Sequence, residues 1–297
     1  MDGLLLVDKP PGLTSHDVVA RVRRLAGTRK VGHAGTLDPM ATGVLVLGLG
    51  RATRLLGHLA LTDKAYDATI RLGVSTSTDD AEGEVLGTAD PGAVAALSVA
   101  AINDAVATLT GDIAQVPATV SAIKVDGRRA YARARTGEDV VLAARPVMVS
   151  RFEITAVRRQ LASAPSPVLE LDAYVECSTG TYVRALARDL GAALGVGGHF
   201  TALRRTRVGP YTLAESRTLT ELEDGVVVLP LAEAAARAFP RRTLDAAEAG
   251  RLAHGVALDA RGQGPGPVAA FDAAGELIAL VRERDGLARP LVVFAPA

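Results

Sequence analysis

The sequence GHAGTLDPMATG occupies residues 32–43 and holds three glycines and one proline. Residues 32–39 have neither helical nor strand periodicity, so they predict a loop with a fixed, irregular backbone. The loop contains one carboxylate, Asp38, which the following proline biases towards an extended conformation. Asp38 is either an acceptor for backbone amides in a turn or a lone catalytic carboxylate in a preorganised loop. A single acid without a second argues against ordinary glycoside hydrolysis.

The segments around this loop mix strand and helix patterns without a regular alternation. Residues 4–8 and 44–49 are apolar runs that predict buried strands, and residues 14–25 have helical spacing behind a Thr or Ser cap. The same criteria predict strands at 66–72, 147–157, 169–177 and 200–208, and helices at 93–109, 130–135 and 181–194. The polar segment 75–83 predicts an exposed loop. Because no βαβ rhythm occurs, the pattern favours an α+β fold over a doubly wound α/β fold.

Length and composition bound the architecture. A chain of 297 residues, 48% hydrophobic and 22% charged, is globular and long enough for two domains. From about residue 240 onward, short apolar runs are separated by Gly and Pro. This pattern predicts a small β-rich domain of residues 239–297 after a main domain of residues 1–238. The single cysteine, Cys177, excludes an internal disulfide framework and a cysteine-rich zinc site. Without an apolar run of membrane-spanning length or a signal-peptide pattern, we expect a cytoplasmic protein with no membrane partner.

The charges balance over the whole chain but not locally. The 33 basic and 33 acidic residues give a net charge of zero, which by itself argues against a nucleic-acid partner. Residues 1–58, 121–160 and 184–211, however, contain 22 basic and nine acidic side chains, whereas residues 76–115 contain seven acidic side chains and no Lys or Arg. Local sign matters more than the sum for attracting a polyanion. The sequence therefore predicts that one face binds RNA and that this face holds Asp38.

A second motif points to a different class of protein. Residues 48–53 read GLGRAT, follow an apolar run and imitate the glycine fingerprint of dinucleotide-binding proteins. The place of the third glycine is taken by Thr53, and no regular βαβ unit follows. A tight turn is the plainer interpretation. A dinucleotide enzyme remains an alternative that a cofactor-binding titration would test.

Six stretches of the chain resemble motifs of the bacterial TruB-type tRNA pseudouridine synthases, in the order of that family. They are LLLVDKPPGLTSHDVVARVRR (4–24), GHAGTLDPMATGVL (32–45), DKAYDATIRLGVSTSTDDAEG (63–83), QVPATVSAIKVDGRRAYARARTG (115–137), CSTGTYVRALARDLG (177–191) and HFTALRRTRVGPY (199–211). Together they span most of residues 3–213, and this many motifs in order are highly specific. The closing segment resembles a PUA-like RNA-binding domain much more weakly.

The resemblance implies a fold and an activity. The fold is a mixed, mostly antiparallel sheet with flanking helices, followed by the small β-rich PUA-like domain. The activity is isomerisation of one uridine in the T loop of tRNA, uridine-55, to pseudouridine. Because the base leaves its ribose, rotates and rejoins through C5, nothing is oxidised and no group is lost, so we expect no cofactor or metal. The long C-terminal extension of relatives that use guide RNAs is absent, so we expect a stand-alone enzyme that binds tRNA as a monomer.

The resemblance also assigns roles to residues. Asp38 matches the catalytic aspartate, a nucleophile that must be ionised and attacks either C1′ of the ribose or C6 of the base. Tyr66 matches the tyrosine that stacks on the target base and can accept the proton from C5. Arg184 matches the arginine that favours the ionised aspartate. The substrate-binding candidates are His33, Tyr182, Leu203, Lys9, Lys64, Arg204 and Arg205. Each has a plainer alternative, such as core packing for Tyr66 or loop support for Lys9 and Lys64.

Extraction of a base from the T-loop stack costs roughly a few kcal/mol, which contacts to the RNA backbone must supply. The candidates for phosphate contacts are Arg21, Arg23, Arg24, Arg128, Arg129, Arg133, Arg204, Arg205 and Arg207. The alternative function is a tRNA-folding chaperone without essential catalysis. The intact set of Asp38, Tyr66 and Arg184 favours the isomerase, since a pure binding protein need not keep Asp38.

Overall fold

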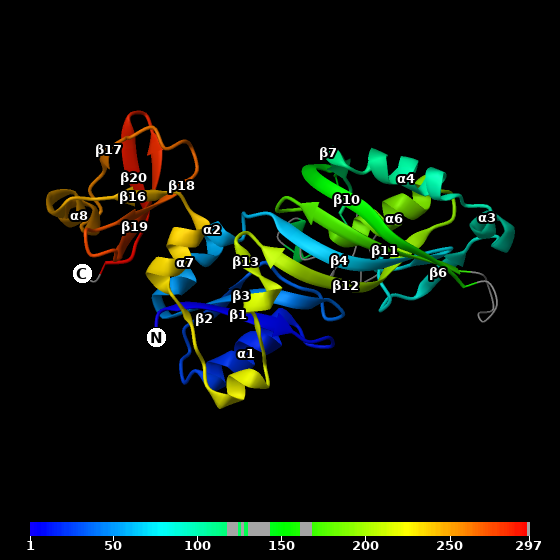
Figure 1. Ribbon diagram of the computed structural model, residues 1–297, viewed down its shortest axis with the longest axis horizontal. Helices are drawn as coiled ribbons and strands as arrows, with labels where there is room; N and C mark the ends of the chain where they lie inside the picture. Colours follow the sequence, from blue (N-terminus) through cyan, green and yellow to red (C-terminus); the bar gives the residue numbers. More distant parts are fainter. Residues whose placement is uncertain (118–123, 126–127, 130–142, 161–167, 296–297) are drawn as a thin grey trace. The chain divides into compact units, whose positions relative to one another are not determined.

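The computed structural model describes residues 1–117, 124–125, 128–129, 143–160 and 168–295 (Figure 1). Contacts divide the chain into two compact units. Unit 1 comprises Met1–Pro39, Gly43–Thr62 and Val208–Ala297, and unit 2 comprises Met40–Thr42 and Asp63–Arg207. The predicted helix at 130–135, with Arg133, lies outside the described residues, as do the side chains of Arg128 and Arg129. Within the described ranges, no helix is long and apolar enough to cross a membrane.

The main sheet of unit 1 is built around β1 (Gly3–Lys9), as the apolar run at residues 4–8 predicts. β1 pairs antiparallel along its whole length with β3 (Thr42–Leu49) and, at its start, with β15 (Leu229–Pro230). Near its end it pairs in parallel with β14 (Arg217–Thr218). Both central strands are almost completely buried, which explains why each is a continuous apolar run rather than an alternating one.

The first residues of the predicted loop form a strand instead. β2 (Val31–Ala34) pairs antiparallel with β3, so the prediction of a loop over residues 32–39 is wrong at its start. A four-residue strand that contains a glycine has too little alternation to be recognised, yet pairing with β3 satisfies its backbone groups. The irregular backbone begins at Gly35, whose φ of 71° lies in the left-handed region.

Helix α1 (Ser15–Leu25) begins where the sequence predicts. Its N-cap is Thr14, whose hydroxyl accepts from the Asp17 amide (3.1 Å), while the Asp17 carboxylate accepts from the Thr14 amide (2.9 Å). This capping box fixes the first turn. The GLGRAT stretch ends in the short 3₁₀ helix η1 (Gly50–Arg54), which leads into α2 (Leu56–Leu59). It is therefore a turn and does not open a βαβ unit.

The rest of unit 1 contains short elements and a second, smaller sheet (Figure 1). The short elements are β13 (Tyr211–Thr212), η2 (Leu213–Glu215), η3 (Glu221–Asp224) and α7 (Leu231–Ala238). The second sheet has the order β16 (Arg241–Thr243), β18 (Pro267–Phe271), β19 (Leu277–Arg284), β20 (Leu287–Val293) and β17 (Leu258–Asp259), and helix α8 (Ala246–Ala253) packs beside it. The prediction of a β-rich C-terminal part is confirmed.

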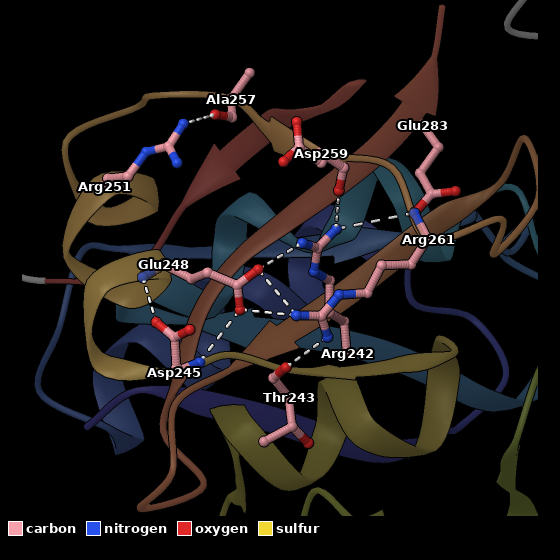
Figure 2. Close-up of polar contacts among 9 residues, drawn as sticks. All are labelled: Arg242, Thr243, Asp245, Glu248, Arg251, Ala257, Asp259, Arg261 and Glu283. Carbon is pink, nitrogen blue, oxygen red and sulfur yellow. Dashed lines mark hydrogen bonds and ion pairs between the residues drawn. The ribbon is translucent and has the colours of Figure 1, made fainter. Parts of the chain in front are cut away.

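A buried arginine ties α8 to this second sheet. Arg242, whose side chain is 1% exposed, donates from Nη2 to Glu248 Oε1 (3.0 Å) and from Nη1 to the Asp259 carbonyl (2.9 Å). Glu248 also accepts two bonds from Arg261 Nη2, at 2.9 and 2.8 Å (Figure 2). Because water is excluded from the Arg242 guanidinium, these partners must compensate for its lost hydration.

Unit 2 is an antiparallel sheet covered by helices (Figure 1). The strand order is β12 (Gly198–Val208), β4 (Lys64–Leu72), β11 (Val168–Cys177), β10 (Arg145–Gln160) and β7 (Gly111–Gln115). In the described part of unit 2 the helices are α3 (Pro91–Ala95), α4 (Val99–Thr108) and α6 (Val183–Ala193), and the two-residue strands β8 (Lys124–Val125) and β9 (Arg128–Arg129) pair with each other. The predicted strands at 66–72, 147–157, 169–177 and 200–208 are confirmed. So is the α+β fold with a mixed, mostly antiparallel sheet.

Two predictions in unit 2 are wrong. The helix predicted over 93–109 is two helices, because Ser98 caps α4 by accepting from the Ala101 amide (3.1 Å). The segment 75–83 is not an exposed loop. Its start belongs to β5 (Val74–Thr76), which pairs with β6 (Val85–Thr88), and Asp79 and Asp80 are buried. Arginines of α6 pair with both carboxylates, which makes their burial tolerable.

Candidate active site

The loop that carries Asp38 lies in unit 1 and is held on both sides of this residue. Just before it, Leu37 donates its amide to Ser15 Oγ (2.9 Å), and its carbonyl accepts from the same hydroxyl (3.1 Å). Just after it, the Pro39 carbonyl accepts from the Gly12 amide (2.9 Å). Ser15 is only 1% exposed, so water does not compete for these bonds. The backbone on either side of the half-buried Asp38 is therefore preorganised.

Lys9 supports the same loop. It is fully buried, and its ammonium group donates to the carbonyls of Pro10 (2.9 Å), Leu13 (2.6 Å) and Pro39 (3.1 Å). An ammonium has three hydrogens, so these three acceptors use its whole donor capacity. The arrangement favours loop support over the phosphate contact that the sequence left open for Lys9.

His33 lies in unit 1, on β2. Its half-buried ring packs edge-to-face against the ring of His16 from α1, with centroids 5.3 Å apart and planes at 87°. The structure thus gives this candidate a second imidazole as neighbour, which the sequence did not predict. The strand holding His33 runs directly into the loop of Asp38.

In unit 2, Arg184 lies in the first turn of α6 and is bound to the loop that precedes β6. Its Nη1 donates to the Thr78 carbonyl (2.8 Å) and to Asp80 Oδ2 (3.0 Å). The side chains of Arg184 and Asp80 are 10% and 3% exposed, so the pair is shielded from solvent. The Asp80 carbonyl accepts from Thr76 Oγ1 (2.7 Å), which fixes the backbone of the acid as well. Arg184 is thus held in one orientation.

Tyr182 is the residue before α6, at the N-cap position. Its amide donates to Gln115 Oε1 (2.7 Å), and Gln115 is 2% exposed at the end of β7. The first helical turn therefore has its backbone anchored to the sheet. The expected helix from residue 181 begins two residues later, at Val183, because Tyr182 is still extended.

Tyr66, Lys64 and Arg205 lie on neighbouring strands of unit 2. Tyr66 is 6% exposed on β4, on the same side as the buried apolar residues of that strand. Lys64, at the start of β4, is largely buried, and burial together with the nearby charge of Arg205 lowers its pKa to about 8. Burial raises the pKa of Cys177, its partner on β11, to about 11. In this shielded polar environment, the side chains of Lys64 and Arg205 are held close together.

Leu203 and Arg204, on β12, lie beside a hollow of about 470 Å³ in unit 2. Its other lining residues are mostly polar and include Thr42, Asp67, Thr69 and Asp172. Arg204 reaches Thr42 by donating from Nη1 to the threonine hydroxyl (3.2 Å). Tyr66 is not among the residues that line this hollow, and it lies on β4 beside the exposed Asp67.

Two of the arginines that the sequence offers for phosphate contacts have acidic partners. Arg21 pairs with Glu223, and Arg207 pairs with Glu176 at 3.2 Å. Surface pairs of this kind contribute about 0–1 kcal/mol, so an RNA phosphate can replace either acid at little cost. The other described candidates include Arg204 and Arg205. Within the described residues, no cluster of three or more His, Cys, Asp and Glu is placed to hold a metal ion.

Three family models match the chain in succession. They are the TruB family pseudouridylate synthase N-terminal domain at residues 23–183, the tRNA pseudouridylate synthase B C-terminal domain at 184–246, and the tRNA pseudouridine synthase II C-terminal model at 239–295. The first alone covers more than half of the chain. This chain belongs to the TruB family. As a TruB family member it is a pseudouridine synthase, and therefore an isomerase.

Individual relatives agree with the TruB assignment. The tRNA pseudouridine synthase B of Nocardia farcinica is 62% identical over 297 residues, which covers 100% of this chain and 94% of the relative. That of Thermobifida fusca is 59% identical over 294 residues, 99% of both chains. Among solved structures, a chain from a Cbf5–Nop10–Gar1 complex is 26% identical with a TM-score of 0.73, covering 99% of this chain and 85% of that chain.

Two residues with clear places in this TruB chain escaped the sequence analysis. Asp80 carries the carboxylate that binds Arg184, and Gln115 holds the backbone of Tyr182. Both lie within stretches that resemble the family, but neither residue type marks its position as part of a site. Asp80 is one of several acids in a polar segment, and Gln115 is a neutral side chain at a strand end. Their partners are 104 and 67 residues away, respectively, and only the fold brings them together.

Proposed function

We propose that this enzyme converts one uridine in the T loop of tRNA, uridine-55, to pseudouridine, with Asp38 as nucleophile on a flipped-out nucleotide. The observation that carries the proposal is the loop of Asp38. Bonds to Ser15, Gly12 and Lys9 fix the residues on either side of the one carboxylate in this stretch. A nucleophile that is already held in place does not need to be ordered during the reaction. The names of the close relatives support tRNA as the substrate.

The chemistry exchanges one bond between base and ribose for another. The N1–C1′ glycosidic bond breaks, the uracil rotates, and C5 bonds to C1′. The proton on C5 leaves and N1 gains one, so atoms and electrons balance without an oxidant or a leaving group. Asp38 makes the rearrangement possible in one of two ways. It adds to C1′, where it displaces N1 and is itself displaced when C5 bonds to C1′, or it adds to C6 and is eliminated again after the C5–C1′ bond has formed. We accordingly propose a reaction that uses no cofactor or metal.

The other candidate residues are assigned different roles according to their burial and contacts. We propose that Tyr66 stacks on the target base and accepts the C5 proton, and that Arg184, held by Asp80, stabilises negative charge at the reacting groups. Tyr182, Leu203 and His33 are proposed to contact the flipped nucleotide. The half-buried Arg204 is proposed to contact phosphate, whereas Lys64 and Arg205 are buried and suit the shaping of the base pocket.

The proposal extends to the molecular context. We propose a main domain of residues 1–238 and a PUA-like domain of residues 239–297 that adds contacts to the tRNA. We also propose that the protein acts in the cytoplasm as a monomer and needs no guide RNA. Light scattering would give the oligomeric state, and activity on a tRNA transcript with no other RNA present would test the last point.

The position of the product tests the function. Purified enzyme is incubated with tRNA transcripts, and pseudouridine is mapped by chemical derivatisation and primer extension. We expect modification at uridine-55 and none in a transcript with cytidine there. Modification at other uridines with none at uridine-55 would contradict the proposed site. Binding of the transcript without any pseudouridine formation would favour the tRNA-folding chaperone instead.

A further inference from the structure

Two ion pairs join the loop at residues 78–80 to successive turns of α6. Arg184 pairs with Asp80 (3.0 Å), and Arg188, one turn later, pairs with Asp79 (3.3 Å). Residues four apart lie on the same side of a helix, so both guanidinium groups face the loop. The proposed chemistry uses the first pair only.

Arg188 also reaches a third segment. Its Nη2 donates to the carbonyl of Val116 (2.7 Å), the residue after β7. The preceding residue, Gln115, accepts from the Tyr182 amide. Arg188 therefore bridges the loop of Asp79 and the end of β7 across the first turns of α6. The planar guanidinium, with donors pointing in different directions, can make both contacts at once, whereas a lysine ammonium is a single point of charge.

Asp79 has two features that do not favour stability. Its φ of 60° lies in the left-handed region, which is uncommon for residues with a side chain. Its side chain is 12% exposed, and burial raises the pKa of its carboxyl above the ordinary 3.8, although the charges of Arg188 and Arg184 act in the opposite direction. The remaining charges that act on it, Asp189 and Asp80, are negative and raise the pKa further.

The raised pKa determines how Asp79 affects folding. An acid whose pKa is higher in the folded chain than in the unfolded chain stabilises the fold only while it is protonated. That contribution is lost as the pH rises through the folded pKa. Burial therefore disfavours the ionised carboxylate of Asp79 rather than favouring it. The ion pair with Arg188 offsets part of the cost of this burial, and it also fixes the loop beside Arg184.

We propose that Asp79 and Arg188 are positioning residues for Arg184. Their ion pair holds the 78–80 loop against α6, and this loop supplies both acceptors of Arg184 Nη1, the Thr78 carbonyl and the Asp80 carboxylate. A displacement of the loop would move both acceptors together and let the guanidinium turn. The inference rests on the proposed function, in which Arg184 takes part in catalysis.

Two substitutions test the positioning role. In Asp79→Asn the charge is removed, while the shape and the tolerance for left-handed backbone are kept. In Arg188→Gln the bridge is removed from the other side. For each variant we expect the single-turnover rate of pseudouridine formation to fall by about tenfold, the scale of coupling between contacting residues. We expect the tRNA dissociation constant to stay close to that of the wild type. Rates are compared at a temperature where each variant is folded, because Arg188→Gln leaves the buried Asp79 carboxyl without its charged partner.

The double variant and a matched control sharpen the test. Both substitutions break the same ion pair. The double variant, Asp79→Asn with Arg188→Gln, should therefore be no slower than the slower of the two single variants. Arg188→Lys should recover only part of the rate, since it restores the charge but not both contacts. The control is Asp104→Asn, the same substitution at an exposed aspartate of α4. Its rate should equal that of the wild type.

A pH series separates positioning from folding. Protonation of Asp79 makes the wild type resemble Asp79→Asn. The ratio of their rates should therefore shrink as the pH is lowered, and the raised pKa of Asp79 places this change at a higher pH than for an ordinary aspartate. The ratio of wild type to Asp104→Asn should stay near one throughout. A merely structural contact would instead give a rate that follows the folded fraction at each pH.

The outcomes are distinguishable. Wild-type rates for Asp79→Asn and Arg188→Gln, beside an inactive Asp38→Asn, would overturn the positioning role and leave the proposed function intact. A slow rate that merely tracks a smaller folded fraction, measured by circular dichroism under the assay conditions, would also overturn it. Turnover by Asp38→Asn would overturn the proposed function and this inference with it.

Discussion

Removal of the Ser15 hydroxyl tests whether the loop of Asp38 has to be held. In Ser15→Ala the amide and the carbonyl of Leu37 lose a shared partner at a place where Ser15 is 1% and Leu37 is 4% exposed. A hydrogen bond contributes about 1 kcal/mol net, and an unpaired buried group costs about 1–3 kcal/mol. We therefore expect the free energy of unfolding to fall by about 2 kcal/mol.

The helix itself cannot account for such a loss. Ser15 is the first residue of α1, and alanine is a better helix former than serine, so the local change favours the helix. The N-cap, Thr14, is unaltered. A measured loss would thus report on the bonds to Leu37 and on the loop that they fix.

The assay compares stability with rate. Urea denaturation gives the free energy of unfolding, and single-turnover kinetics at a temperature where the variant is folded gives the rate. We expect the rate to fall by about tenfold or more, with unchanged tRNA affinity, because a misplaced catalytic group loses orientation rather than binding. The matched control is Ser98→Ala, which removes the N-cap hydroxyl of α4 at a cost of about 1 kcal/mol and should leave the rate unchanged. A destabilised Ser15→Ala with wild-type rate would refute the reasoning.

Three further predictions concern charge. The pKa of Lys64 falls from 10.5 to about 8 on folding, so the folded chain gives up this proton first and gains stability as the pH rises between these values. We compare the free energy of unfolding of the wild type with that of Lys64→Met. The wild-type value minus the variant value should increase by up to about 3 kcal/mol from neutral to alkaline pH. A difference that does not change with pH would contradict this prediction. Glu248→Gln should cost about 2 kcal/mol in urea denaturation by weakening the contacts of buried Arg242, whereas exposed Glu276→Gln should cost nothing measurable. Arg204→Glu should weaken tRNA binding and lower its dependence on salt; unchanged affinity in a salt titration would remove Arg204 from the RNA contact surface.

Strong local patterns predicted the elements that surround the site. The apolar run at residues 4–8 gave β1, and the cap at Thr14 gave the start of α1. Alternation at residues 169–177 gave β11. In each case the signal is contained within one element, because burial or capping acts on consecutive residues.

The missed features depend on distant partners. Residues 75–83 are polar and therefore resemble an exposed loop, yet Asp80 is buried because Arg184 comes to it from 104 residues away. The break at Ser98 was hidden within an alanine-rich segment. Lys9 could have bound phosphate by its type, but its burial under three carbonyls is visible only in the folded chain. That one basic face holds Asp38 stays a prediction.

The central claim is that Asp38 is the nucleophile, and tritium release tests it most directly. The tRNA carries uridine labelled at C5, so each isomerisation frees one tritium into water. We expect release by the wild type, none by Asp38→Asn, and equal tRNA binding by both proteins in a filter assay. Appreciable release by Asp38→Asn would contradict the account.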